Sequence, residues 1–294
     1  MREVNNGHYL RTWIIIVAFC FMGGRTYGQN KHQVDDHLLF HSTFDDTTDV
    51  NLFGPDNDAG WIYTADSTRR FRVLMNNRCP SVTIAKSEGK IRDCLNFAST
   101  TKDVLFYQAS PNLESPRSDW SGTVSFWLKP RLGRFKTDTC YPIQLCDGNW
   151  DHGGFFVRFC GKPSSAFQLG TVSGRNVGQL IPFPEDVAEE QCSTVTVDTA
   201  LVPNDQWTMV SFTFENINSS RREVSIVKLY LNEKLAGEIR KPLRINWMEP
   251  DSLEGEPNAA VFLGINYVGS VDDLRMYYRS LTGPRIKMLY QAAQ

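Results

Sequence analysis

The chain has 294 residues, of which 41% are hydrophobic, 12% aromatic and 22% charged. This balance excludes wholesale disorder, a collagen-like repeat and a long coiled coil. The formal net charge of −2 gives no electrostatic reason to expect a nucleic acid or an anionic membrane surface as a partner. Because no long linker or internal repeat divides the sequence, we expect a single domain over residues 29–294.

The first 28 residues have the pattern of a secretory signal. Arg2 and Arg11 precede an apolar run over residues 13–22, and small residues enter at 23–28. The run is too short to span a bilayer, which takes about 20 residues. We therefore expect cleavage after Gly28 and a secreted or extracytoplasmic product with no transmembrane segment.

Cysteine content gives a second prediction. Removal of Cys20 with the signal leaves six cysteines, namely Cys79, Cys94, Cys140, Cys146, Cys160 and Cys192. An even number in an exported chain argues for disulfides, while zinc binding would need a Cys-x-x-Cys pair or a histidine at ligand spacing, which the sequence lacks. Six cysteines allow 15 pairings. We expect sequential pairs: Cys79 with Cys94, Cys140 with Cys146, and Cys160 with Cys192.

Period-two alternation dominates the remaining chain and predicts β-strands. Residues 122–130, for example, place Val124, Phe126 and Leu128 on one face. Other strands are expected at 38–44, 91–97, 104–108, 154–159, 166–171, 194–197, 207–214, 224–231, 260–264 and 271–278. Short strands separated by turn residues indicate an antiparallel sandwich or barrel.

Helical spacing is confined to the C-terminus, where residues 283–290 predict a short helix with Pro284 at a tolerated first-turn position. Residues 46–80 and 173–193 are rich in turn-forming residues, so we expect them to be long loops.

Several of these runs share a recognisable form. Leu39 begins LFHSTFD, Val124 begins VSFWLKP, Asp205 begins DQWTMV, Lys228 begins KLYLN, and Gly269 begins GSVDDLRMY. In this order, over residues 37–291, they resemble the laminin G-like branch of the concanavalin-A-like lectin/glucanase superfamily. The resemblance implies an all-β fold, an antiparallel β-sandwich of the concanavalin-A-like jelly-roll type with a short C-terminal helix, whose loops bind ligands. Glu233 departs from the family pattern, which usually has glycine after the asparagine.

One acidic motif resembles the catalytic signature of laminarinase-type glucanases on this fold. Residues 249–254 read EPDSLE, and a retaining hydrolase needs two carboxylates about 5 Å apart on one face of a strand. Pro250 and Ser252 suit a buried strand poorly, and Gly255 and Pro257 follow. We therefore expect a solvated acidic loop and no enzyme activity, with glycan hydrolysis as the less favoured alternative.

The sequence offers two kinds of candidate metal site. His37 and His41 are four apart, which on a strand separates them by about 13 Å, too far to share one ion. The family resemblance implies that the ends of the first and last strands are neighbours, so Asp45 and Asp273 are candidate ligands of a structural Ca²⁺. The alternative is that they are ordinary turn aspartates.

Loop aromatics are candidates for sugar binding, because a pyranose has an apolar face that stacks on an aromatic ring. Trp150 is the strongest of these, since Asn149 and Asp151 beside it can form hydrogen bonds, and Tyr141 and Trp247 are weaker. The alternative for Trp150 is packing over a sheet edge. Residues 218–220 also form an N-glycosylation sequon, which has meaning in a eukaryotic source.

These observations favour a secreted, non-catalytic module that recognises a carbohydrate, matrix or cell-surface ligand. A structural protein-interaction domain without a sugar site is the main alternative. The expected partner is a glycan or an extracellular protein, and not a nucleic acid.

Overall fold

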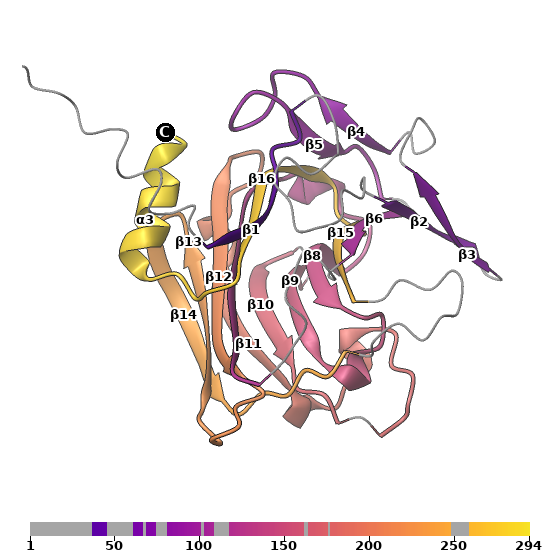
Figure 1. Cartoon of the computed structure of the whole chain (residues 1–294). Helices are drawn as coiled ribbons and strands as arrows, with labels where there is room; N and C mark the ends of the chain where they lie inside the picture. Colours follow the sequence, from indigo (N-terminus) through magenta and orange to yellow (C-terminus); the bar gives the residue numbers. More distant parts are fainter. Residues whose placement is uncertain are drawn as a thin grey trace, which may run out of the picture.

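The computed structural model describes residues 37–45, 61–66, 69–74, 81–100, 103–108, 118–161, 164–175, 177–247 and 259–294. These residues form two antiparallel sheets packed face to face, with the helix α3 (Gly283–Ala292) on one outer face (Figure 1). The predicted antiparallel β-sandwich with a short C-terminal helix is confirmed. The proposed signal at residues 1–28 lies outside the described residues. In the described part, no helix is long and apolar enough to cross a membrane.

Sheet A has eight strands, seven of them in the order β14-β13-β12-β7-β16-β5-β4, while β1 pairs with β16. Their bounds are β1 Leu38–Ser42, β4 Val82–Ala85, β5 Cys94–Phe97, β7 Trp120–Pro130, β12 Thr208–Ile217, β13 Ser225–Leu231, β14 Lys234–Lys241 and β16 Gly269–Tyr277. The first and last strands are therefore neighbours, as the family resemblance implies.

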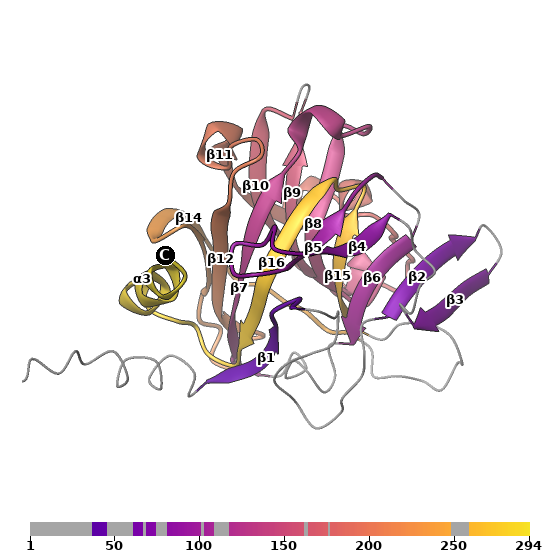
Figure 2. The same ribbon diagram turned by 90° about the horizontal axis from the view of Figure 1, so that it is seen from above.

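Sheet B also has eight strands, in the order β11-β10-β9-β8-β15-β6-β2-β3, and Figure 2 shows the β2–β3 hairpin extending its far edge. Their bounds are β2 Trp61–Asp66, β3 Arg69–Leu74, β6 Asp103–Gln108, β8 Thr139–Cys146, β9 Gly154–Cys160, β10 Ala166–Val172, β11 Cys192–Asp198 and β15 Ala260–Ile265.

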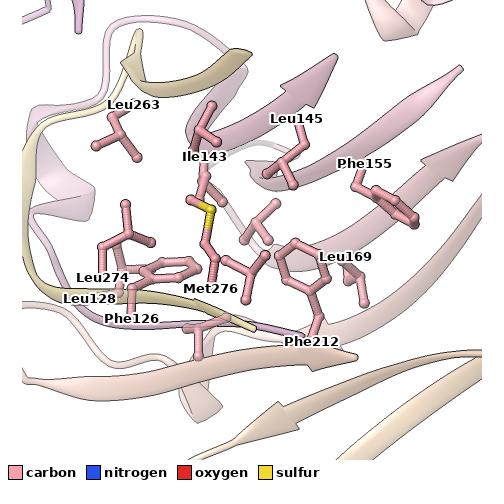
Figure 3. Packing of buried hydrophobic residues seen from close by; sticks show 14 of the residues in the cluster. Phe126, Leu128, Ile143, Leu145, Phe155, Leu169, Phe212, Leu263, Leu274 and Met276 are labelled. Carbon is pink, nitrogen blue, oxygen red and sulfur yellow. The ribbon is translucent and has the colours of Figure 1, made fainter. Parts of the chain in front are cut away.

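The core lies between the sheets and follows from the alternation in the strands. Figure 3 shows Phe126 and Leu128 of β7 and Met276 of β16 facing Ile143 and Leu145 of β8. Each such side chain, fully removed from water, contributes about 1.5–3 kcal/mol. α3 covers a second apolar cluster on the outer face of sheet A, where Tyr290 stacks on Trp127 with ring centroids 5.6 Å apart.

Five strands are not predicted from the sequence, and each has a physical reason. β2 and β3 lie within residues 46–80, so the expectation of one long loop there is wrong. β4 is short, and β14 is a polar edge strand whose charged residues hide the alternation. β8 contains Pro142, which argues against a central strand; a register shift between Cys140 and Ile143 accommodates it.

The β13–β14 turn explains the departure from the family pattern at Glu233. Leu231 pairs with Lys234, so Asn232 and Glu233 alone make the turn. Asn232 has a φ of 56°, whereas Glu233 is not among the positive-φ residues. The left-handed position is thus occupied by asparagine, which tolerates it, and Glu233 does not need to be glycine.

The two sheets approach each other at one long edge. A Cβ on Gly237 of β14 would lie 2.5 Å from a methyl carbon of Val195 of β11, so only glycine fits. On the same edge, Lys241 Nζ donates to Ser193 Oγ at 2.9 Å. The edge strands β14 and β11 therefore lie against each other.

The expected cysteine pairing is wrong for two of its three pairs. Cys140 and Cys146 lie six residues apart in one strand, and Cys160 and Cys192 lie at opposite ends of neighbouring strands, level with Ala166 and Val172 of β10. Six strand residues span about 20 Å, whereas bridged Cα atoms lie within about 7 Å. The five described cysteines have free thiols. Cys79, the partner expected for Cys94, lies outside the described residues.

Peptide mapping of the unreduced protein should therefore find no cross-link between Cys140 and Cys146 or between Cys160 and Cys192. Burial raises the pKa of the Cys146 thiol to about 12 and that of Cys94 to about 11. Because the thiolate is the reactive form, both should resist iodoacetamide at pH 8 until the protein is unfolded. Either cross-linked peptide, or fast native labelling of Cys146, would contradict this geometry.

Candidate ligand-binding face

The outer face of sheet B carries the candidate site, and the loop between β8 and β9 marks one end of it. Asn149 caps a short 3-10 helix over Trp150–His152, since its Oδ1 accepts from the Asp151 N–H at 3.1 Å. His152 Nδ1 and Asp147 Oδ2 lie 2.6 Å apart across the same loop. These local contacts fix the loop, so its polar groups have defined positions.

A second segment, residues 173–175 and 177–191, crosses this outer face and is called here the covering loop. Asp151 Oδ2 accepts from the Gly178 N–H at 3.1 Å, and Asn149 Oδ1 accepts from the Ile181 N–H at 2.9 Å. Ile181 and Val187 are buried beneath the loop against the sheet. A long loop was predicted over residues 173–193; β11 begins at Cys192, and hydrogen bonds anchor the described residues before it.

Trp150 does not have the placement expected of a sugar-stacking residue. It is 1% exposed and packs edge-on against Phe156, with ring centroids 5.8 Å apart. Tyr141 packs on the same Phe156 ring at 5.9 Å and is also buried. Neither ring leaves a face for a ligand, and the alternative interpretation of Trp150 as a packing residue fits its position.

Trp247 also contacts the loop between β8 and β9. Its Nε1 donates to the Gly153 carbonyl at 3.0 Å, and its ring lies edge-on to Trp120 at 5.4 Å. The sequon residue Asn218 holds this segment too, because its side-chain amide exchanges two hydrogen bonds with the backbone of Ile245, at 2.7 and 2.9 Å. Three of the predicted ligand residues, Asn149, Asp151 and Trp247, thus bond to backbone groups, while Trp150 and Tyr141 pack against Phe156.

Beside the covering loop, three side chains form a hydrogen-bonded polar strip across β9, β10 and β11. Arg158 Nε donates to Gln168 Oε1 at 2.8 Å, and Gln168 Nε2 donates to Thr196 Oγ1 at 2.9 Å. The guanidinium also lies 4.8 Å from the centroid of the Phe156 ring. Gly170 makes room for that ring, since a Cβ there would lie 2.0 Å from it. The strip therefore presents planar polar groups in fixed orientations.

Phe183 belongs to the covering loop and is 58% exposed. It lies two residues before Glu185, whose carboxylate accepts a hydrogen bond from the Tyr141 hydroxyl. Burial, together with that carboxylate, raises the pKa of Tyr141, so the phenol remains protonated and donates. The covering loop thus exposes an aromatic ring two residues before its hydrogen bond to the sheet.

Phe183 and the three strip residues were not predicted as site residues, although the sequence contains signals for them. Pro182 and Pro184 flank Phe183 in a turn-rich segment, which indicates a ring held at the surface. Arg158 and Gln168 alternate with apolar residues in predicted strands, which places them on the outer face.

The two aspartates expected to bind calcium do not fit that role as they are placed. Asp273 Oδ1 faces His41 Nε2 at 2.7 Å and Arg275 Nε at 3.1 Å. Asp45 accepts from the Asp93 N–H at 3.1 Å. These oxygens already face proton donors, whereas a calcium ligand needs its lone pairs directed at the ion.

The remaining sequence candidates are the histidine pair and the acidic motif. His37 Nδ1 lies 2.9 Å from the Tyr278 hydroxyl, apart from the His41–Asp273 pair. The acidic motif at residues 249–254 lies outside the described residues.

No protein-family model matches the chain, and no curated protein matches it. Solved structures do. Domain 4 of AbnA, a GH43 extracellular arabinanase from Geobacillus stearothermophilus in complex with arabinotriose, is 20% identical, and the match covers 87% of this chain and 98% of that one, with a TM-score of 0.47. The binding domain of Paraclostridial Mosquitocidal Protein 1 is 13% identical over 88% of this chain and 53% of that one, with a TM-score of 0.51.

A third match is the binding domain of botulinum neurotoxin DC in complex with rat synaptotagmin II, at 12% identity over 89% of this chain and 52% of that one, with a TM-score of 0.49. The chain spans about half the length of the two toxin binding domains. The match to the binding domain of Paraclostridial Mosquitocidal Protein 1, with its TM-score of 0.51, agrees with the β-sandwich fold and does not single out the laminin G-like branch.

Proposed function

We propose that this protein is a secreted, non-catalytic, laminin G-like module that binds a carbohydrate on the outer face of sheet B. The observation that carries the proposal is the presence on one outer face of sheet B of both an exposed aromatic ring, Phe183 of the covering loop, and the hydrogen-bonded polar strip of Arg158, Gln168 and Thr196. A sugar offers an apolar ring face and a rim of hydroxyls, so it is complementary to an aromatic platform beside fixed donors and acceptors.

The other groups around the site support binding rather than hydrolysis. Glu185 accepts from the Tyr141 hydroxyl, and Glu190 pairs with Arg175. These carboxylates are therefore engaged with donors, whereas a glycoside hydrolase needs one carboxylate as an acid and a second beside it. Glycan hydrolysis remains the alternative through residues 249–254, and a Glu249→Gln variant tests it if any hydrolysis is detected.

Two variants test the site once a ligand is found in a glycan and polysaccharide binding screen. Phe183→Ala and Gln168→Ala should each weaken binding about ten-fold, because one removes the platform and the other interrupts the strip. Leu201→Ala is the matched control, since Leu201 is similarly exposed at 54% but lies outside the strip and the covering loop. Unchanged affinity in both site variants would place the ligand elsewhere.

The screen is run with calcium and again with EDTA. Binding that survives EDTA would agree with a site built from Phe183 and the strip, whereas loss of binding in EDTA would restore a calcium site. If a folded sample binds no glycan in either condition, a protein-interaction domain without a sugar site would be favoured.

A further inference from the structure

The covering loop exposes a group of large apolar side chains. Among the described residues six large apolar side chains are exposed. Three of them lie in one seven-residue stretch of this loop: Val177 at 66%, Leu180 at 66% and Phe183 at 58%. These three are called the apolar ridge. The other three, Leu201, Val224 and Leu235, lie elsewhere in the chain. Single exposed apolar residues are ordinary, but a group of this kind on one loop marks a binding surface.

The ridge is held outward by a fixed backbone. The Gly178 and Ile181 N–H groups donate to Asp151 and Asn149, and the Trp150 N–H donates to the Ile181 carbonyl at 2.9 Å. Ile181 is already packed beneath the loop. The exposed side chains therefore cannot turn inward without breaking these bonds, and they keep their apolar surface in water until a ligand covers it.

The ridge and the proposed sugar site share one residue, Phe183. Glu185, two residues later, contacts Tyr141 beneath the loop and interacts electrostatically with Arg158 of the polar strip. From there the ridge runs back to Gly178, above the loop that contains Asp151. A ligand whose sugar lies on the polar strip would thus have its substituent directed along apolar surface.

Charge on the covering loop argues against a lipid bilayer as the occupant. Glu185, Asp186, Glu189 and Glu190 are all exposed and follow the ridge within seven residues, while Arg175 pairs with Glu190. Carboxylates in this number disfavour approach to an anionic membrane surface. A single amphiphilic molecule with a neutral headgroup meets no such penalty.

We propose that the site takes glycosides with an apolar aglycone, with the sugar on the polar strip and the aglycone along the ridge. This inference rests on the proposed carbohydrate function. It predicts that an alkyl chain on the sugar increases affinity, because each methylene removed from water tightens binding about four-fold.

The test compares methyl and octyl β-glycosides of glucose, galactose, xylose and N-acetylglucosamine by calorimetry, below the micelle concentration. For any sugar that binds, the octyl glycoside should bind at least about ten-fold more tightly than the methyl glycoside. In a Val177→Ser/Leu180→Ser double variant that advantage should fall to about two-fold, while the affinity for the methyl glycoside stays unchanged.

The matched control is Leu201→Ser/Leu235→Ser, which removes two similarly exposed leucines (54% and 53%) that line a shallow groove of about 510 Å³ beside Tyr290. This control variant should still bind the octyl glycoside more tightly than the methyl glycoside. If it does not, the alkyl chain of the ligand lies in that groove and the inference is overturned. Equal binding of methyl and octyl glycosides would also overturn it, leaving the carbohydrate function intact. Octyl binding that survives loss of the ridge, or that occurs equally with octyl sulfate, would show non-specific adsorption, and absence of binding by every glycoside would count against both proposals.

Discussion

Replacing Trp150 with alanine should lower the free energy of unfolding by about 3–5 kcal/mol, the range for deleting a buried aromatic side chain. The indole is fully enclosed on the outer face of sheet B, where it contacts Phe156 and lies beneath the covering loop. The surroundings cannot close the gap easily, because Asn149 and Asp151 fix the backbone on both sides. Urea unfolding followed by circular dichroism measures the change.

Phe183→Ala is the matched control, since it truncates an aromatic residue of the same region that is exposed. Its free energy of unfolding should stay within about 0.5 kcal/mol of the wild type. The pair of variants separates structural from ligand-contacting aromatics. A Trp150→Ala protein that keeps its stability but loses glycan binding would show that the sequence-based prediction for Trp150 was right and that the packing interpretation is wrong.

A second large effect is expected at Asp272, which is fully buried in β16. Its Oδ2 accepts from the Ile91 N–H at 2.9 Å, while Oδ1 has no hydrogen-bond partner among the described residues. Burial, reinforced by the neighbouring Asp273 carboxylate, raises the pKa of Asp272 from 3.8 to about 7. The folded protein therefore holds a proton that the unfolded chain releases, and the associated stability is lost as the pH rises from about 4 through 7.

Asp272→Asn removes this titration and retains an oxygen that can accept from Ile91. At pH 8 the charged carboxylate costs the wild type about 4 kcal/mol, so the stability of the variant relative to the wild type should rise by about 2–3 kcal/mol between pH 5 and pH 8. Asp205→Asn is the control, because Asp205 is exposed and its variant should follow the wild-type pH profile. Parallel profiles for Asp272→Asn and wild type would mean that Asp272 is ionised at pH 5 in the native state.

The sequence predicted the strands whose apolar and polar residues alternate cleanly, and it failed where alternation was masked. β7 and β12 were predicted because their residues alternate between two faces of a strand. β8 was missed because Pro142 is a local argument against a strand, and the bulge that resolves the conflict depends on the neighbouring β9. Tertiary pairing of this kind has no local signature.

The candidate site shows the same limit more sharply. Trp150 and Phe183 both lie among turn-forming residues, so their sequence contexts look alike. The difference comes from the covering loop, whose backbone bonds to Asn149 and Asp151 bury Trp150 and leave Phe183 outside. The sequence therefore located the right region of the molecule, but the burial of each ring is decided by contacts between segments about 30 residues apart.

The contact between β14 and β11 has a consequence for how copies of this protein meet in solution. Edge strands normally offer unpaired backbone groups on which a strand from another molecule can add, the first step toward fibrils and tangled oligomers. Here the two edges lie against each other at Gly237 and Val195, and Lys241 links them to Ser193. A strand from another molecule would have to separate β14 from β11 and bury the charges of Lys234, Glu238 and Arg240. We therefore expect that copies of this protein do not associate through this edge, even at high concentration.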